Sequence, residues 1–132
     1  MTNDDPRRKD KIILCVDDDE AIRDVLTHAL GGAGYQAHVC RGGDECLSLL
    51  STIEPQVILL DIDMPYPDGF TTLSEIRRRF PKLEARIVML TAMRTAPYVH
   101  EAKLLGANDY LVKPFRVAQL IERVDFWMGL RT

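Results

Sequence analysis

The alternation of short apolar runs with longer amphipathic stretches constrains the fold of this chain more than any other feature. Five apolar runs occur, at Ile12–Val16, Tyr35–Cys40, Gln56–Leu60, Arg86–Leu90 and Asp109–Val112. They show no clear alternation of polar and apolar residues, which is typical of strands in a parallel sheet covered on both faces. Because crossovers between parallel strands are right-handed, the pattern predicts a doubly wound α/β domain of five βα units, (βα)5, around a five-stranded parallel sheet.

The stretch after the first run shows the expected helical pattern most clearly. Its apolar residues recur with the spacing of one helical face, at Ile22, Val25, Leu26, Ala29 and Leu30. Either Asp18 or Asp19 is expected to cap this helix, and Gly31-Gly32 is expected to end it.

The other four stretches are also predicted to be helices. Pro55 and Pro81 are expected to break the chain after the second and the third. The fourth, from about residue 95 to residue 105, has the weakest apolar face of the five. The fifth carries one apolar stripe from Val117 to Met128, in which Trp127 is expected to be a core residue.

Length and composition favour one globular domain. The chain has 132 residues, of which 46% are hydrophobic and 28% charged, and its net charge of −3 argues against nucleic acid as a direct partner. No apolar run approaches the ~20 residues that span a bilayer, and the charged N-terminus has no signal-peptide core. We therefore expect a flexible, solvated tail at residues 1–10, a domain at residues 11–132, no membrane contact and a cytoplasmic location.

The cysteines fit that location. Cys15, Cys40 and Cys46 are odd in number, form no CxxC pair and lie in apolar segments. Their placement predicts reduced core cysteines rather than a disulfide or a metal site.

Unusual polar residues follow four of the five predicted strands. Asp17 and Asp18 follow the first, Asp61 ends the third, Thr91 follows the fourth, and Lys113 follows the fifth. Ligands of open parallel sheets bind outside the carboxyl ends of the strands. The second strand ends at Cys40-Arg41 without such a group. This difference favours the strand order 2-1-3-4-5, with the second strand at an edge.

The predicted convergence of carboxylates implies a cation. Two carboxylates ~4 Å apart at an effective dielectric constant of ~20 repel by ~4 kcal/mol, so three need a positive partner to stay ionised. Oxygen ligands with room for water suit Mg²⁺, with Mn²⁺ as the alternative ion. Lys113 and Thr91 would add a charge and a hydroxyl donor for an anion such as a phosphoryl group, which Asp61 could attack. Helix capping explains Asp17 and Asp18 equally well when they are taken alone.

Four segments together resemble the response-regulator receiver domain of two-component signalling, of the CheY-like superfamily with its flavodoxin-like fold. The resemblance extends from about Lys11 to Met128 and is carried by Ile13–Asp19, Leu59–Pro65 with Asp68-Gly69, Val88–Ala92 and Gly106–Phe115. It implies that the chain takes a phosphoryl group from a sensor histidine kinase or a phosphotransfer protein. Its chemistry would be limited to its own phosphorylation and autodephosphorylation, so it would not be an enzyme with a separate substrate.

The resemblance also implies roles for single residues. Asp61 would be the phospho-acceptor and a metal ligand, Asp18 a direct Mg²⁺ ligand, and Asp17 a ligand through water. The backbone carbonyl of Asp63 would complete the metal site, and the Asp63 side chain would influence the dephosphorylation rate.

Three further residues would carry the signal. Lys113 would pair with the phosphoryl group, Thr91 would be the switch hydroxyl, and Tyr110 the switch aromatic. The face made by the fourth helix, the fifth strand and the fifth helix would then signal to an output domain or downstream protein, or to a second copy in a phosphorylation-dependent homodimer. Asp109 and Arg123 are expected to form an ion pair on this face.

Two other functions share parts of the pattern. Asp61-Ile62-Asp63 is a DxD after a strand, which also resembles the nucleophile motif of haloacid-dehalogenase phosphatases, although that motif normally opens its domain. A flavodoxin-like FMN carrier shares the layout. Its phosphate-binding first loop would be rich in Ser, Thr and Gly, whereas this chain has the acidic Asp17–Glu20 there.

Overall fold

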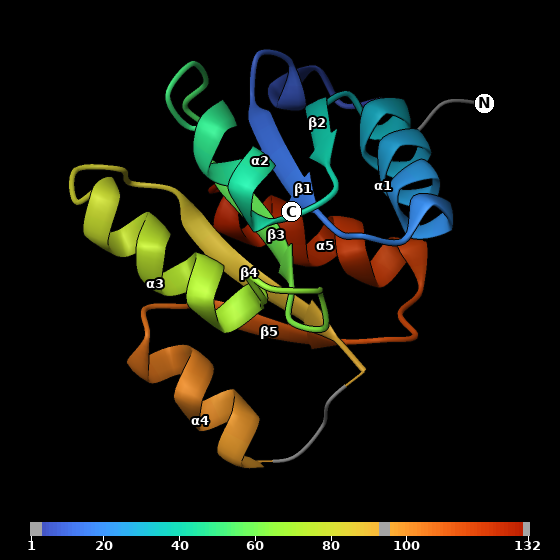
Figure 1. Cartoon of the computed structure of the whole chain (residues 1–132). Coiled ribbons are helices and arrows are strands. Elements are labelled where there is room, and N and C mark those ends of the chain that lie inside the picture. The colour runs from blue at the N-terminus through green and yellow to red at the C-terminus, as the bar shows by residue number, and fades with distance from the viewer. Residues whose placement is uncertain (1–3, 93–95, 131–132) are drawn as a thin grey trace.

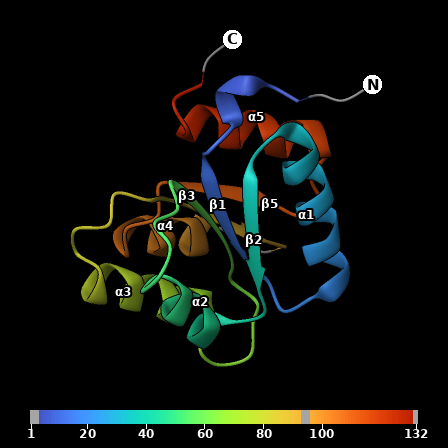
Figure 2. The ribbon, with the colours of Figure 1, turned by 90° about the horizontal axis from the view of Figure 1, so that it is seen from above.

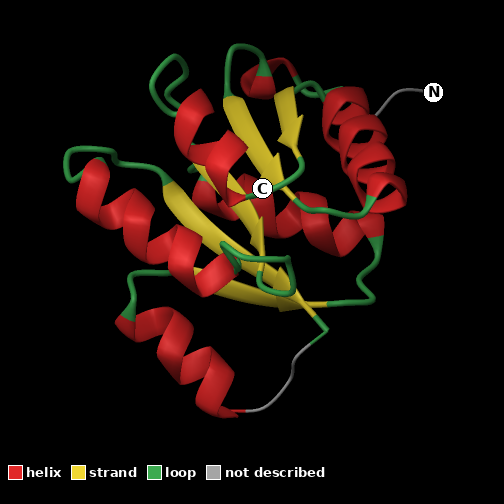
Figure 3. Ribbon diagram, viewed as in Figure 1, coloured by secondary structure: helices red, strands yellow, loops and turns green. Residues whose placement is uncertain are grey.

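The computed structural model describes residues 4–92 and 96–130. One parallel sheet of five strands lies at its centre, in the order β2-β1-β3-β4-β5, and Figures 1 and 3 show the strands and the helices around them. The predicted doubly wound α/β fold and its strand order are thus confirmed. The strands are β1 (Ile12–Val16), β2 (Gln36–Cys40), β3 (Val57–Asp61), β4 (Arg86–Thr91) and β5 (Asp109–Val112).

Helices cover both faces of the sheet. Figure 2 shows α1 and α5 on one side and α2, α3 and α4 on the other. Their bounds, with those of a short 3-10 helix before β1, are η1 (Pro6–Arg8), α1 (Glu20–Ala33), α2 (Gly43–Leu49), α3 (Gly69–Arg79), α4 (Ala96–Leu104) and α5 (Val117–Trp127).

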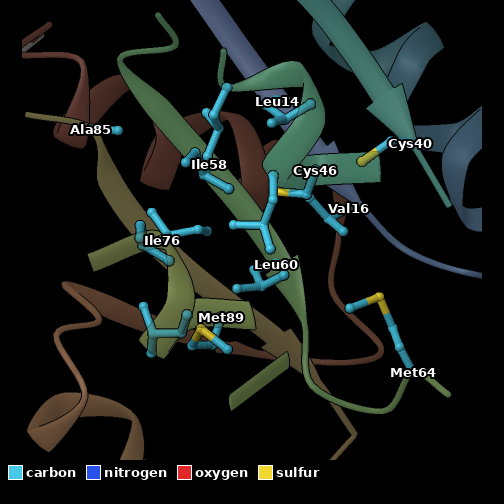
Figure 4. Packing of buried hydrophobic residues seen from close by; sticks show 14 of the residues in the cluster. Leu14, Val16, Cys40, Cys46, Ile58, Leu60, Met64, Ile76, Ala85 and Met89 are labelled. Carbon is cyan, nitrogen blue, oxygen red and sulfur yellow. The ribbon is translucent and has the colours of Figure 1, made fainter. Parts of the chain in front are cut away.

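The two helical layers bury two separate apolar clusters. Leu14 of β1 contributes to the cluster under α2 and α3 (Figure 4), whereas its neighbours Ile13 and Cys15 contribute to the cluster under α1 and α5. Both sets are buried because the sheet is covered on both faces, which explains why the central strands β1 and β3 are apolar up to Asp61. The three cysteines are free and buried, as predicted.

The register of the central strands fixes where the polar residues emerge. Val16 of β1 pairs with Leu60 of β3, so the residues that follow them, Asp17 and Asp61, leave the sheet side by side. On the other side of β3, Asp61 pairs with Leu90, directly before Thr91. The carboxyl edge of the sheet therefore gathers groups that lie far apart in the sequence.

Helix α1 ends later than predicted. It runs through Gly31-Gly32 and ends at Gly34, whose φ of 111° is left-handed. The N–H of Gly34 bonds the Gly31 carbonyl (3.0 Å) and the N–H of Tyr35 bonds the Leu30 carbonyl (3.1 Å), which is a Schellman motif. This closure and the burial of Leu30 and Ala33 outweigh the low helix propensity of two interior glycines.

Helix α4 has the poorest contact with the core, as its sequence predicted. Ala102 is its one buried residue among those described, and Leu104 is 73% exposed. The expected first residue, Thr95, lies outside the described residues. In α5, by contrast, Leu120 and Val124 are buried, and the partly buried Trp127 packs against the same cluster.

The segment before β1 differs from the solvated tail expected at residues 1–10. In the described part, Arg8 is only 9% exposed. Its guanidinium lies 2.6 Å from the carboxylate of Asp125 in α5 and donates to the carbonyl of Ala33 (3.1 Å). The hydroxyl of Tyr35 also donates to Asp125, and the Arg8 guanidinium lies over the Tyr35 ring. The sequence alone predicts a solvated tail here, because the partners of Arg8 lie far along the chain: Asp125 is in α5 and Tyr35 directly precedes β2.

None of the described helices combines the length and the apolar character that crossing a membrane requires.

Candidate functional site

Three carboxylates converge at the carboxyl edge of the sheet. Asp17, Asp18 and Asp61 each offer an oxygen atom, and these atoms lie within 4.8 Å of one another. Asp17 and Asp61 are buried, with 1% and 3% exposure, whereas Asp18 is exposed. The cluster is thus a partly buried acidic pocket with one side open to solvent.

The backbone around β1 holds Asp17 and leaves Asp18 open. The Asp17 carbonyl accepts from Arg23 (2.9 Å), and the Oδ1 atom of Asp17 accepts from the N–H of Asp19 (2.9 Å). Asp19 caps α1 by accepting from the N–H of Ala21 (2.9 Å), which settles the choice between Asp18 and Asp19. The contact between Arg23 and the Asp17 carbonyl was not predicted, because the sequence shows only that Arg23 lies on the polar face of α1.

The loop after β3 packs closely on the backbone of Asp61. The N–H of Gly69 donates to the carbonyl of Ile62 (3.1 Å). A Cβ atom at Gly69 would lie 2.3 Å from the Asp61 carbonyl oxygen, so a glycine is required for this approach. Asp68 caps α3 by accepting from the N–H of Thr71 (2.8 Å), which places the start of α3 against the site.

Lys113 brings a positive charge to the two buried carboxylates. Its Nζ lies 2.8 Å from Oδ2 of Asp17 and 3.5 Å from Oδ1 of Asp61. The N–H of Lys113 donates to the carbonyl of Thr91 (2.7 Å), so β4 holds the lysine backbone in place. Burial works to lower the pKa of Lys113, but its bond with Asp17 and the charge of Asp61 outweigh this effect and raise it.

The electrostatics of Asp61 disfavour its charged form in the metal-free protein. Burial, and then the negative charge of Asp17, raise the pKa of Asp61 to about 6, although Lys113 acts in the opposite direction. A cation among the three carboxylates would relieve this repulsion, and oxygen donors of this kind suit Mg²⁺ or Mn²⁺. The predicted carboxylate residues therefore fit a divalent ion.

Thr91, Asp63 and Tyr110 form a second group beside the acidic pocket. The fully buried Thr91 donates from Oγ1 to Oδ2 of Asp63 (3.4 Å), and the N–H of Asp63 donates to Oδ1 of Asp61 (3.2 Å). Burial and the charge of Asp63 raise the pKa of Tyr110, while a hydrogen bond with Thr91 lowers it. The bond between Thr91 and Asp63 was not predicted, because nothing in either motif pairs the two side chains.

The structure thus brings together the residues proposed from the sequence. Asp17, Asp18, Asp61 and Lys113 form one pocket, and Asp63 and Thr91 adjoin it. Away from the pocket, the expected ion pair is present, with Arg123 2.9 Å from Asp109. The indole N–H of Trp127 also donates to Asp109 (2.8 Å), so the carboxylate is held by two residues of α5.

The sequence matches a known family over most of its length. Residues 13–125 match the profile of the response regulator receiver domain. The DNA-binding transcriptional regulator NtrC of Klebsiella pneumoniae is 41% identical over 114 residues, which are 86% of this chain and 24% of that protein. NtrC of Escherichia coli K12 is 39% identical over the same shares. The chain spans about a quarter of the length of these curated relatives.

Solved structures of receivers have the same fold. Chemotaxis protein CheY4 of Vibrio cholerae superposes with a TM-score of 0.84 at 31% identity, covering 88% of this chain and 97% of that one. The response regulator TrrA of Thermotoga maritima, in complex with Mg²⁺ and beryllium fluoride, gives a TM-score of 0.77 at 33% identity, covering 89% and 98%. The family match favours the receiver interpretation over the phosphatase and the FMN carrier. The chain belongs to the response regulator receiver domain family of two-component systems.

Proposed function

We propose that the chain takes a phosphoryl group onto Asp61 from a phosphohistidine of a sensor histidine kinase or a phosphotransfer protein. The observation that carries the proposal is the position of the Asp61 carboxylate. It lies at the end of β3 within one pocket that also holds two other carboxylates and the ammonium group of Lys113. An anion could approach this carboxylate only where positive charge offsets the acidic residues.

The same residues support a divalent ion. Asp18 is exposed and is therefore suited to direct contact with the ion. Both oxygens of Asp17 are already bonded, one to the N–H of Asp19 and the other to Lys113. The carboxylate of Asp61 and the backbone carbonyl of Asp63 complete the proposed ligand set. When bound, Mg²⁺ would supply positive charge to the phosphoryl oxygens and to the acceptor.

The transfer step follows from the positions of the side chains. A carboxylate oxygen of Asp61 forms a bond to phosphorus as the bond between phosphorus and the histidine nitrogen breaks, and the imidazole leaves with the electron pair. Lys113, 3.5 Å from Asp61, neutralises charge on the transferred group. The acyl phosphate carries a charge of about −1.5 to −2 in place of the single negative charge of the carboxylate, and Thr91 can donate a hydrogen bond to it.

The signal would leave through α4, β5 and α5. Tyr110 of β5 is hydrogen-bonded to Thr91, so a change at the hydroxyl reaches this face directly. The partner would be an output domain or downstream protein, or a second copy of the chain in a phosphorylation-dependent homodimer, with no direct contact to nucleic acid. Buried, free cysteines support a cytoplasmic location.

Phosphorylation with acetyl phosphate tests the proposal. Intact mass should show one added phosphoryl group in the presence of Mg²⁺ and none in EDTA, and the Asp61→Asn variant should gain none. Asp44→Ala, which removes an exposed carboxylate in α2, is the matched control and should be labelled like the unmodified chain. Labelling of Asp61→Asn, or labelling in EDTA, would contradict the assignment.

A further inference from the structure

Three successive peptide groups in the loop after β1 are each held by a hydrogen bond. The N–H of Asp17 donates to the carbonyl of Cys40 at the end of β2 (3.1 Å). The carbonyl of Asp17 accepts from the guanidinium of Arg23 in α1 (2.9 Å), and the N–H of Asp19 donates to Oδ1 of Asp17 (2.9 Å). The two peptide groups that flank the Cα atom of Asp18 are therefore both fixed.

This arrangement determines the direction of the Asp18 side chain. The orientation of the two flanking peptide planes sets φ and ψ of Asp18, and these angles decide where its Cβ atom points and which rotamers it can adopt. Asp18 is exposed, so packing against neighbours restrains it little. One of its carboxylate oxygens nevertheless lies within 4.8 Å of oxygens of Asp17 and Asp61. The backbone, rather than side-chain packing, directs Asp18 toward the pocket.

Arg23 supplies the one bond of the three that comes from a side chain outside residues 17–19. It is half-buried and lies near the amino-terminal end of α1, where the helix dipole disfavours a positive charge. Its acceptor is the neutral carbonyl of Asp17, a residue that is only 1% exposed. The bond therefore restrains the loop without pairing two charges.

We propose that Arg23 is a positioning residue for the metal site: by holding the Asp17 carbonyl, it keeps the Asp18 carboxylate directed at the divalent ion. This inference rests on the proposed function, in which Asp18 contacts Mg²⁺ directly. The charge of Arg23 has the opposite effect, because a cation beside the pocket repels Mg²⁺. Loss of the guanidinium should weaken Mg²⁺ binding if Arg23 positions the loop, and strengthen it if Arg23 acts through its charge alone.

Titration calorimetry of the full chain with Mg²⁺ tests this sign. Arg23→Met removes the donor and keeps most of the length of the side chain, and we expect it to raise the Kd for Mg²⁺ about tenfold, as loss of a residue that orients a metal ligand does. Arg41→Met is the matched control, because Arg41 is an exposed arginine directly after β2 at the same edge of the sheet. It should not weaken binding. An unchanged or lower Kd in Arg23→Met, or an equal loss in both variants, would overturn the proposal.

Phosphorylation kinetics separate positioning from damage to the fold. The rate of labelling with acetyl phosphate should reach half its maximum at about ten times more Mg²⁺ in Arg23→Met than in the unmodified chain, in keeping with the weaker binding. At saturating Mg²⁺ the two rates should be similar, since Arg23 does not touch the reacting atoms. A lower rate at every concentration, without a change in the Mg²⁺ requirement, would contradict a positioning role.

Amide exchange in EDTA reports on the loop without any metal. The N–H of Asp19 should exchange about tenfold faster in Arg23→Met, the size expected for loss of one hydrogen bond that restrains it. The N–H of Asp63, which donates to Oδ1 of Asp61 (3.2 Å), should be unaffected. Unchanged exchange at Asp19 would overturn the proposal. Failure of the proposed function has a different signature, namely no added mass with acetyl phosphate in any variant, and the exchange measurement does not depend on it.

Discussion

At the scale of single residues, the charge of Asp61 is only partly balanced by the protein itself. The carboxyl group is buried, lies beside Asp17, and has its pKa raised to about 6 from a reference value of 3.8. Lys113 does not compensate fully, because it is shared with Asp17. The negative charge of Asp17 and Asp61 is therefore only partly offset by Lys113.

This imbalance predicts a pH-dependent stability of the metal-free protein. The folded chain binds the Asp61 proton more tightly than the unfolded chain, so Asp61 contributes stability that is complete below pH ~4 and is lost as pH rises through about 6. In EDTA, urea denaturation should give a free energy of unfolding that is higher at pH 5 than at pH 7, by an amount on the order of 2 kcal/mol. Asp61→Asn should lack it, and equal pH dependence in both proteins would contradict this prediction.

Two glycines should respond oppositely to the same substitution. A Cβ at Gly69 would lie 2.3 Å from the Asp61 carbonyl oxygen and 2.5 Å from the Ile62 Cα, so Gly69→Ala must displace the acceptor loop. We expect a loss of about 1–3 kcal/mol in the free energy of unfolding. Gly32→Ala, in α1 with no atom within 4 Å, should instead stabilise by about 0.5–1 kcal/mol. Urea denaturation measures both, and a loss of the same size at Gly32 would refute the steric explanation.

The sequence predicted which residues gather at the site but not how they bond to one another. Asp17, Asp61, Thr91 and Lys113 each end or follow a strand, and strand ends of a parallel sheet must meet at one edge. The bond between Thr91 and Asp63 depends instead on a side-chain rotamer in the loop after β3. Neither the periodicity nor the spacing of residues in the sequence predicts a side-chain rotamer.

At the scale of elements, helix existence was predictable and helix ends were less so. The apolar stripe of α1 identified the helix, but the glycine that ends it is Gly34 rather than Gly31-Gly32. A glycine inside a helix and a glycine that closes one look alike in the sequence. The difference comes from burial of Leu30 and Ala33, which favours one more turn.

Helix α4 should be the least protected of the five α-helices. Its one described buried residue is Ala102, whereas α3 buries Gly69, Thr72, Leu73 and Ile76. Few buried contacts mean a small free energy of local opening. Hydrogen exchange of the unphosphorylated protein should therefore be faster in residues 98–104 than in α3. Equal protection would show that α4 is held by contacts other than core burial.

At the scale of the whole molecule, residues 4–11, before β1, are part of the folded domain. Arg8 joins α5 through Asp125 and the end of α1 through the carbonyl of Ala33. The side chains of Arg8 and Asp125 are only 11% and 17% exposed. Such a partly buried pair is costly to break on one side, because the remaining carboxylate has no opposite charge and keeps only the neutral Tyr35 hydroxyl as a donor.

Removal of this contact should destabilise the entire fold. Arg8→Ala should lower the free energy of unfolding by about 2–4 kcal/mol, since the largely buried Asp125 loses the guanidinium paired with it. Arg7→Ala is the matched control: its side chain is 52% exposed and pairs with Asp5, so we expect a change of about 0–1 kcal/mol. Chemical denaturation at neutral pH measures both. Similar losses in the two variants would show that Arg8 acts as an ordinary surface residue.

The contact of Arg8 with α5 also places the two described ends of the polypeptide, Asp4 and Leu130, along the same groove. Asp4, Pro6 and Leu130 line one groove beside α5, and Figure 2 shows both ends on the side of that helix. A short peptide linker could therefore join them, with new termini opened in the exposed turn at Ser51-Thr52. Such a circular permutant would begin with β3 and visit the strands in a new order, yet pair each strand with the same neighbours. The arrangement of strands that creates the acidic pocket is thus separable from the order in which the ribosome makes them.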